Sequence, residues 1–403
     1  MPAQDHVVLG MMSGSSLDGL DLALCRICLD TTGEQLVPEW EILAAETDTF
    51  PRPWQARLRA APHLPGRELW RLHADLGHWI GQRAKKFMDR FPAYAPTLAG
   101  SHGHTIFHDP SQKFTTQIGD GAAIAMHLGI PTVTEFRGSD VAFGGQGAPL
   151  APLADKHLFP EYDGFLNLGG IVNLSLRKKD GDYIAGDITG CCQILDRLAT
   201  REGLGYDAGG QLAAQGSPAP AIAQKIAVLP FHQLPYPKSL GNAWVRESLW
   251  PMLDDKSVPA ADLLHTFTRW LAKKIAYDLA HLVAEVGAVP RSGDASSGSL
   301  SSSKKGAAAG AAKGTKQPTE PTRILLTGGG IHNHFLVEQL RGTQDSEAPV
   351  FEFIVPDAIT ADFKEAALIA LAALLRVQGM PNALPSATGA PQPTVNGAVY
   401  YGQ

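Results

Sequence analysis

The chain has 403 residues, of which 44% are hydrophobic, and a formal net charge of -6 at pH 7. This length and apolar content predict two or three domains with sizeable cores, and the acidic balance excludes a general nucleic-acid binder, which needs a positive surface. The N-terminus lacks the basic region of a secretory signal, and the longest nearly uncharged apolar stretch, Ala366 to Leu375, is about half of a bilayer span. We therefore expect a cytoplasmic protein without a membrane helix.

The first 135 residues predict three strands followed by alternating helices and strands. The expected elements are strands at 7–12, 21–29 and 40–47, a helix at 69–90, a strand at 98–107, a helix at 122–128 and a strand at 131–136. This order is typical of a mixed sheet with helices on its faces. Cys25 and Cys28, three residues apart on a strand, point to opposite faces, so we interpret the four cysteines as structural.

A similar order begins near Asp163. The segments GFLNLGG, IVNLSLRKKDG and DYIAGDITG alternate apolar strands with glycine turns, and residues 194–201 then have helical spacing. We interpret this repetition of strand, glycine-rich turn and strand as a structural duplication. Two similar lobes would then face one cleft.

Residues 291–322 contain mainly Ser, Gly, Ala, Lys and Pro and no periodic apolar positions, which predicts a disordered insert. A helical apolar stripe at 267–282 precedes it, and strand, turn and helix follow it. The predicted domains are residues 1–138, residues 139–379 with the insert, and a tail at 380–403 that packs back on both.

Three glycine-rich turns follow predicted strands. The first, GMMSGSSLDGLD at 10–21, combines glycines, hydroxyls and aspartates, a composition suited to an anion-binding nest with a carboxylate for Mg²⁺. A plain β-hairpin with an Asp-Gly turn fits the same residues. Gly169 and Gly170, and Gly328 to Gly330, end two other strands, and ligands of such sheets bind where strand ends meet.

Several polar residues could line the same space. His102 and His104, with His108 further along, suggest either a metal site or hydrogen-bond donors of a cleft wall, and we favour the second interpretation. Arg137 and Asp140, with Gln146 on the same loop, could bind hydroxyls or a carboxylate. Alternatively, Arg137 and Asp140 pair with each other on the surface.

Two carboxylates are candidates for chemistry. Asp187 stands where a strand runs into a turn, opposite the first glycine turn under the duplication, and could accept a proton from water or a hydroxyl. The alternative is a cap of the following helix. Glu365 lies near the predicted start of an apolar helix, where a carboxylate also stabilises a helix N-terminus.

Ten stretches in order resemble the anhydro-N-acetylmuramic acid kinases, members of the acetate and sugar kinase, heat-shock chaperone and actin superfamily. The stretches are GMMSGSSLDGLD, SHGHTIFH, QIGDGAAIA, EFRGSDVAFGGQGAPL, LNLGGIVNLS, YDAGGQLA, PKSLG, LLTGGG, DFKEAALIALAAL and LPSATGA. Only the segment 291–322 has no counterpart in the family's typical pattern.

The resemblance implies an α/β fold of two ribonuclease H-like (actin-like ATPase) domains, each a mixed five-stranded sheet flanked by helices, around a central cleft, usually in a homodimer. It also implies an ATP- and Mg²⁺-dependent kinase that opens the 1,6-anhydro ring of anhydro-N-acetylmuramic acid with water and phosphorylates O6, in cell-wall recycling. By position, Asp187 is the catalytic base, and the sugar-binding residues are His102, Arg137, Asp140, Gln146 and Glu365. The implied ATP-binding residues are Gly14, Ser15, Ser16, Leu17, Asp18, Gly19, Leu20, Asp21, Gly169, Gly170, Asn173, Gly328, Gly329 and Gly330, with Asp21 holding Mg²⁺ through the phosphates.

One departure concerns the turn after Asp187. The family commonly has D-T-G-P-G-N there, whereas this chain has DITGCCQ at 187–193. The aspartate is present and the asparagine is not, which leaves the exact sugar preference open. A kinase for another anhydrosugar such as levoglucosan is one alternative function, and a non-catalytic nucleotide-binding regulator of the same fold is another.

Overall fold

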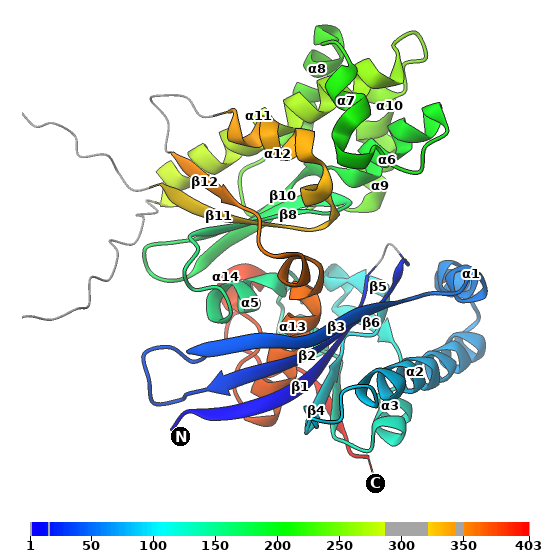
Figure 1. Ribbon diagram of the computed structural model, residues 1–403, viewed down its shortest axis with the longest axis vertical. Helices are drawn as coiled ribbons and strands as arrows, with labels where there is room; N and C mark the ends of the chain where they lie inside the picture. Colours follow the sequence, from blue (N-terminus) through cyan, green and yellow to red (C-terminus); the bar gives the residue numbers. More distant parts are fainter. Residues whose placement is uncertain (1, 15–16, 287–320, 344–349, 403) are drawn as a thin grey trace, which may run out of the picture.

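The computed structural model describes residues 2–14, 17–286, 321–343 and 350–402. It has two lobes, one around each large sheet (Figure 1). The N-terminal sheet contains β1 (Gln4–Ser13), β2 (Gly19–Leu29), β3 (Glu39–Thr49), β4 (Leu98–Ser101), β7 (Thr132–Thr134) and β13 (Ala398–Tyr400). The C-terminal sheet contains β8 (Gly164–Leu168), β9 (Ile171–Arg177), β10 (Tyr183–Gly190), β11 (Thr322–Thr327) and β12 (Phe351–Ile354).

The two sheets share one topology. The spatial orders are β3-β2-β1-β4-β7 and β10-β9-β8-β11-β12. In each sheet, the three strands that come first in the chain form antiparallel pairs. The next two strands run parallel to the first of these three, β1 or β8. This confirms the predicted duplication and the ribonuclease H-like fold. Strand β13 pairs antiparallel with β7 and adds a sixth strand to the five expected in the N-terminal sheet.

Both faces of the N-terminal sheet are buried. Because side chains alternate along a strand, Leu9 and Met11 of β1 pack toward α2 (Gly66–Met88) and α3 (Gly121–Leu128), whereas Val8 packs toward α13 (Ala358–Val377). Cys25 joins the core on the α13 face, and Cys28, on the other face, is only partly buried. The strands therefore have few polar positions except near their ends.

Helix α13 lies between the two sheets. The C-terminal sheet packs one face against α6 (Cys192–Ala199), α11 (Ala260–Val286) and α12 (His334–Arg341). Its other face, through Phe165, Tyr183 and Leu325, shares a core with α13 and α5 (Ala151–His157). Figure 1 shows α13 and α5 at the junction of the lobes. The division of the chain at residues 138 and 379 stays a prediction, because α13 belongs to the cores of both sheets.

The remaining elements are short. A separate hairpin consists of β5 (His104–Asp109) and β6 (Phe114–Ile118). The other α-helices are α1 (Arg52–Ala60), α4 (Gly138–Ala142), α7 (Gln211–Gln215), α8 (Pro220–Ala227), α9 (Asn242–Trp244), α10 (Trp250–Leu253) and α14 (Pro385–Thr388). None of the helices in the part of the chain that the structure describes is long and apolar enough to cross a membrane.

Three expectations need correction. The single strand predicted at 98–107 is wrong, because the chain turns at Gly103, which has φ +69, and continues into the β5–β6 hairpin. The apolar helix begins at Ala358, two turns before Glu365, and Asp357 caps it through Thr360 N. Most of the predicted insert, residues 291–320, lies outside the described residues, and Thr322 begins strand β11.

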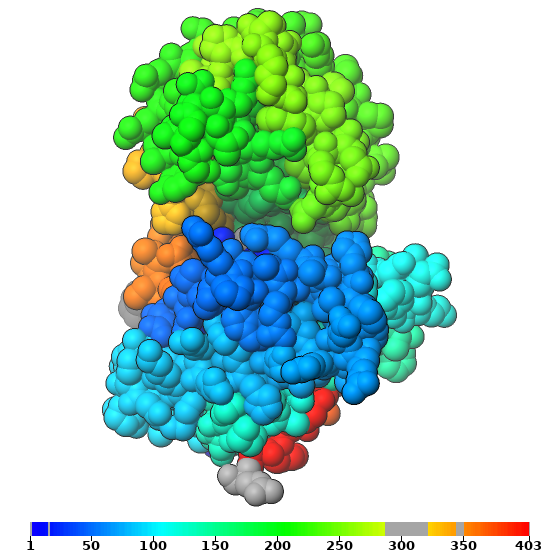
Figure 2. All heavy atoms as spheres, turned by 90° about the vertical axis from the view of Figure 1, so that its right-hand side faces the viewer, coloured from blue at the N-terminus to red at the C-terminus, as the bar shows by residue number. Residues whose placement is uncertain are grey.

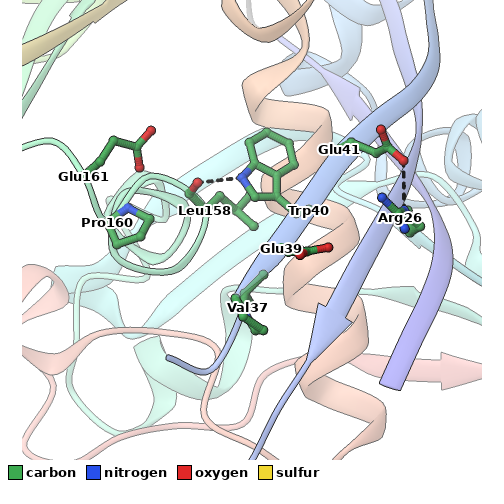
Figure 3. A pocket seen from close by; sticks show the side chains of 9 residues that line it. Arg26, Val37, Glu39, Trp40, Glu41, Leu158, Pro160 and Glu161 are labelled. Carbon is green, nitrogen blue, oxygen red and sulfur yellow. Dashed lines mark hydrogen bonds and ion pairs between the residues drawn. The ribbon is translucent and has the colours of Figure 1, made fainter. Parts of the chain in front are cut away.

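Figure 3 shows a surface pocket between β3 and the turn after α5. Its lining includes Val37, Trp40 and Pro160, and the Trp40 indole N–H donates to the Leu158 carbonyl at 2.6 Å. None of the predicted site residues lines this pocket. We therefore place the candidate site elsewhere, between the lobes.

Candidate active site

A row of polar side chains crosses the C-terminal sheet near its strand ends. Thr327 pairs with Asn167, Asn167 with Asn173, and Asn173 with Asp187, across β11, β8, β9 and β10. Residues in register share a face, and their strand neighbours Leu166, Leu168 and Leu326 point to the opposite face, toward α11. The row therefore faces the N-terminal lobe.

Asp187 is held from one side. Its Oδ2 accepts from Ser239 Oγ at 2.9 Å and from Leu240 N at 2.8 Å. Burial raises the pKa of this half-buried carboxyl, and the two hydrogen bonds oppose that rise. The alternative role of Asp187 as a helix cap is wrong, because Cys191 occupies the N-cap of α6 and makes no side-chain cap.

The turn after Asp187 keeps close backbone contacts despite its unusual sequence. A β-bulge lies between Asp187 and Thr189. Cys191 N donates to Gly170 O at 2.8 Å and Cys192 N to Gly169 O at 3.1 Å. The start of α6 is therefore bonded to the second glycine turn by main-chain atoms, which do not depend on the residue types.

The other two glycine turns also adopt unusual backbone conformations. Leu17 has φ +62, and Gln55 Nε2 donates to its carbonyl at 3.3 Å. Gly328 has φ +81, and a Cβ there would lie 2.4 Å from Asn167 Oδ1, so only glycine fits. A short 3-10 turn, Gly329–His332, follows Gly328 and leads into α12, in the predicted order of strand, turn and helix.

The residues predicted to bind ATP are spread over three strand ends. Gly14 and Asp18 lie in the β1–β2 turn, Gly19 begins β2, and Ser15 and Ser16 lie outside the described residues. The side chains of Leu17 and Leu20 are buried in the core on the α2 face, so only their backbone can contact a ligand. Asp21 is on the α13 face of β2, since it has the same parity as Ala23 and Cys25.

Asp21 and Glu365 lie close together. Asp21 accepts from Thr47 Oγ1 at 2.6 Å. Burial first, and then the charge of Asp21, raise the pKa of Glu365. Because Glu365 is also exposed to solvent, it is surrounded by protein and yet reached by water, as a side chain in a cleft wall is.

Arg137 connects Glu365 to His102. Its Nε donates to His102 Nε2 at 3.0 Å and its guanidinium donates to Gly147 O at 2.7 Å. Desolvation lowers the pKa of His102 to about 3, with a further contribution from the Arg137 charge. Burial lowers the pKa of Arg137 to about 10, and the charge of Glu365 opposes this fall, so Arg137 stays charged beside a neutral imidazole.

Asp140 belongs to a buried network with the C-terminal tail. It accepts from Gly147 N at 2.7 Å and from Thr388 Oγ1 at 2.9 Å, and Asn396 Oδ1 accepts from its N–H. The surface pair of Arg137 with Asp140 is therefore wrong. Gln146 is exposed on the same loop, and its N–H donates to Thr388 O at 2.7 Å.

The histidines act as hydrogen-bond partners. His102 Nδ1 lies 3.1 Å from Gly103 O, and His104 Nδ1 lies 3.3 Å from Ser13 Oγ. Within the described ranges, no group of three or more His, Cys, Asp or Glu side chains is arranged to hold a metal by itself.

The surface is hollowed between the lobes (Figure 2). Asp18 of the β1–β2 turn and Asp196 of α6 lie on opposite sides, and burial, with the charge of Asp18, raises the pKa of Asp196 to about 6. The first glycine turn and α6 are therefore close enough to interact electrostatically across the hollow.

Comparison with known proteins assigns the family. A family model described as anhydro-N-acetylmuramic acid kinase matches residues 6–297 and 307–402. The anhydro-N-acetylmuramic acid kinase of Synechococcus elongatus is 32% identical to this chain, and the alignment covers 98% of this chain and 99% of the relative. That of Xanthomonas oryzae pv. oryzae is also 32% identical, and the alignment covers 99% of this chain and 100% of the relative. The chain belongs to the anhydro-N-acetylmuramic acid kinase family.

The family match also corrects one expectation. The unmatched internal residues are 298–306 only, so the segment without a family counterpart is shorter than 291–322. Among solved structures, a xylulose kinase from Rhodospirillum rubrum aligns with 99% of this chain and 94% of its own, at 10% identity and a TM-score of 0.38. A likeness this remote has no bearing on activity.

Sequence reasoning missed several residues of the site. Ser239 and Leu240, the partners of Asp187, lie more than fifty positions away from it in the chain, and PKSLG at 237–241 was noted only as a motif of the resemblance. Asn167 and Thr47 were not singled out. The register of the strands would have indicated both, because they pair with the predicted residues Asn173 and Asp21.

Proposed function

We propose that this protein is an ATP-dependent kinase that opens the 1,6-anhydro ring of anhydro-N-acetylmuramic acid and phosphorylates O6, giving N-acetylmuramic acid 6-phosphate. The family match over nearly the whole chain supports the reaction. The observation that carries the mechanism is the placement of Asp187, a carboxylate at a strand end that faces the other lobe and is hydrogen-bonded through one oxygen.

In this proposal, Asp187 accepts a proton from water as the water oxygen bonds to C1. The C1–O6 bond breaks, and O6 takes the γ-phosphoryl group while ADP leaves. A carboxylate suits this step because it is ionised at neutral pH and a general base must accept a proton at the moment of attack. Atoms balance with one water, one ATP and one anhydrosugar consumed.

The nucleotide would lie against the glycine turns. Backbone N–H groups of the turns at 14–21, 169–170 and 328–330 would bind the phosphates, with Asn173 beside Asp187 in the adjacent strand. On the sugar side, the Arg137 guanidinium, Gln146 and Glu365 would bind hydroxyls and the carboxylate. His102 and Asp140 would act through the groups that they hold, Arg137 and the loop at 140–147, because the ring nitrogens of His102 and the oxygens of Asp140 bond to protein.

Mg²⁺ fits the residues present. The pKa of Asp21 is raised by burial and, further, by the charges of Asp362 and Asp18. A cation held by Asp21 and the ATP phosphates would offset this repulsion. When bound, the ion would neutralise charge on the transferring phosphoryl group.

The test is product analysis with purified protein, ATP, Mg²⁺ and the anhydrosugar. We expect a 6-phosphate by mass spectrometry, and one heavy oxygen at C1 when the reaction runs in heavy-oxygen water. N-acetylmuramic acid incubated in the same water measures spontaneous exchange at C1, and levoglucosan tests sugar preference. Absence of the 6-phosphate from the anhydrosugar would refute the proposal.

Asp187→Asn should lower kcat about 10²- to 10⁴-fold, because the amide cannot accept the proton. Steady-state kinetics with binding of ATP measured in parallel would check this. Asp182→Asn, an exposed aspartate of the turn before β10, is the matched control and should keep full activity. Full activity in Asp187→Asn would remove this residue from the mechanism.

We also propose a cytoplasmic homodimer. The cytoplasmic location follows from the N-terminus and the lack of a long apolar stretch in the sequence, and the homodimer follows from the resemblance, whose family the comparisons support. Sedimentation velocity of the purified chain would measure the mass in solution, and a monomer at all concentrations would contradict the dimer.

A further inference from the structure

A segment far from Asp187 in sequence lies next to it in the fold and forms hydrogen bonds with it. Residues 231–242, which we term the holding loop, begin in a 3-10 turn after α8 and end at the first residue of α9. Asp187 N donates to Lys238 O at 2.8 Å, and Ser239 Oγ and Leu240 N both donate to Asp187 Oδ2. The backbone and the carboxylate of Asp187 are thus bonded to three consecutive residues of the holding loop.

The holding loop is itself anchored to α11. Tyr236 OH donates to Asp278 Oδ2 at 3.0 Å, and Lys274 Nζ donates to Asp278 Oδ1 at 2.7 Å and to His232 O at 3.1 Å. Asp278 is buried, so these bonds are shielded from water. The anchor fixes the main chain of the loop independently of Ser239.

The loop also lies directly on strand β10. A Cβ at Gly186 would be 2.7 Å from the Tyr236 ring and 2.8 Å from Lys238 O. The absence of a side chain at Gly186 therefore lets the loop approach close enough for Ser239 and Leu240 to reach Asp187.

Both side-chain bonds of Asp187 end on the same oxygen. The terminal torsion of an aspartate has broad minima, so a single donor would still allow the carboxylate to rotate. Two donors on Oδ2, one from the main chain and one from Ser239, restrict that rotation and leave Oδ1 outside both bonds. Oδ2 thus holds the carboxylate in place and Oδ1 stays available. This arrangement suits a base, which needs one oxygen directed at the proton that it accepts.

We propose that Ser239 is a positioning residue of the reaction, whose hydroxyl fixes the carboxylate of Asp187 so that Oδ1 accepts the proton of the attacking water. This inference rests on the proposed function, in which Asp187 is the base. Because Ser239 is exposed and the loop is anchored elsewhere, its replacement removes the hydroxyl without removing the loop.

The test is Ser239→Ala, with kcat/KM and kcat measured between pH 4.5 and 9. A hydrogen bond to a carboxylate favours its ionised form, so its loss raises the pKa of Asp187, and the acid limb of the profile should move up by roughly half to one pH unit. We expect kcat on the plateau to fall about tenfold and KM for ATP to stay within about twofold. Ser239→Thr, which keeps the hydroxyl, should restore both the acid limb and the plateau.

The matched control is Ser257→Ala, which removes a serine-to-aspartate bond of the same kind, Ser257 Oγ to Asp255 Oδ1 at 2.6 Å, in an exposed turn outside the site. It should leave the profile unchanged. An active wild type with an unshifted acid limb in Ser239→Ala overturns the positioning role, as does a loss of kcat that Ser239→Thr does not recover. An inactive wild type instead refutes the proposed function, so the two failures are distinguishable.

Discussion

At the scale of single residues, the site combines a neutral histidine with a charged arginine. His102 is buried, its Nδ1 lies within hydrogen-bond distance of Gly103 O, and its Nε2 accepts from Arg137. Burial disfavours a charged imidazole, and protonation at Nε2 would also place two cations 3.0 Å apart, so the pKa of His102 falls from 6.5 to about 3. The imidazole therefore stays neutral over the whole physiological pH range.

This has a consequence for stability. Between about pH 3 and pH 6.5 the unfolded chain protonates His102 and the folded chain does not, so His102 lowers the free energy of unfolding as pH falls, by about 1.4 kcal/mol per pH unit. His102→Gln removes this titration. Urea unfolding at pH 4.5, 5.5 and 6.5 should show a shallower loss of stability in the variant, and parallel curves for variant and wild type would contradict the assignment.

At the scale of elements, helix α13 positions Glu365 by lying very close to β1. A Cβ at Gly10 would be 1.9 Å from the main-chain oxygen of Ala366, the residue after Glu365. Ala366, Ala367 and Ala370 are buried and small, which lets the helix backbone approach the sheet. The close contact therefore determines how far Glu365 extends from the sheet toward Asp21.

Gly10→Ala should destabilise the protein by about 3 kcal/mol, because the methyl group has no space and backbone must move. It should also raise KM for the sugar by displacing Glu365. Thermal unfolding and kinetics would measure both effects. Gly66→Ala, where a Cβ meets nothing within 4 Å, is the control and should change stability by less than about 1 kcal/mol.

At the scale of the whole molecule, a buried ion pair joins the lobes. Lys364 of α13 donates to Asp155 Oδ1 of α5 at 2.5 Å, and Ser175 of β9 donates to Asp155 Oδ2 at 2.5 Å. The Lys364 ammonium also lies 4.5 Å from the centre of the Phe165 ring. One carboxylate is thereby bonded to β9 of the C-terminal sheet and to α13, which also packs on the N-terminal sheet. Lys364 is next in sequence to the site residue Glu365.

Lys364→Met should cost about 3 to 5 kcal/mol of stability, because it leaves the Asp155 carboxylate buried without its partner. Adding Asp155→Asn removes that charge and keeps an acceptor for Ser175, so the double variant should be more stable than Lys364→Met alone. A double-mutant cycle by urea unfolding would give the coupling, expected above about 1 kcal/mol. If the stability changes of the two single variants simply add, Lys364 and Asp155 do not interact and the ion pair does not join the lobes.

The local pattern of the chain predicted much of this protein. Apolar segments at 7–12 and 21–29 predicted strands of a sheet with helices on its faces, and the repeated strand, glycine turn and strand predicted the duplicated fold. These features follow from interactions between residues near each other in sequence. The motif order further indicated the family, which the comparisons show.

The partners of the site residues depend on the tertiary structure. The sequence left three alternatives open: a pair of Arg137 with Asp140, a cap by Asp187 and a helix terminus at Glu365. The fold gives each residue a different partner or position, namely His102, Ser239 and the interior of α13. A side chain's spacing in the chain determines which face it occupies. Which groups meet it there is decided by the packing of helices and loops from elsewhere, because only folding brings residues fifty or two hundred positions apart within hydrogen-bond distance.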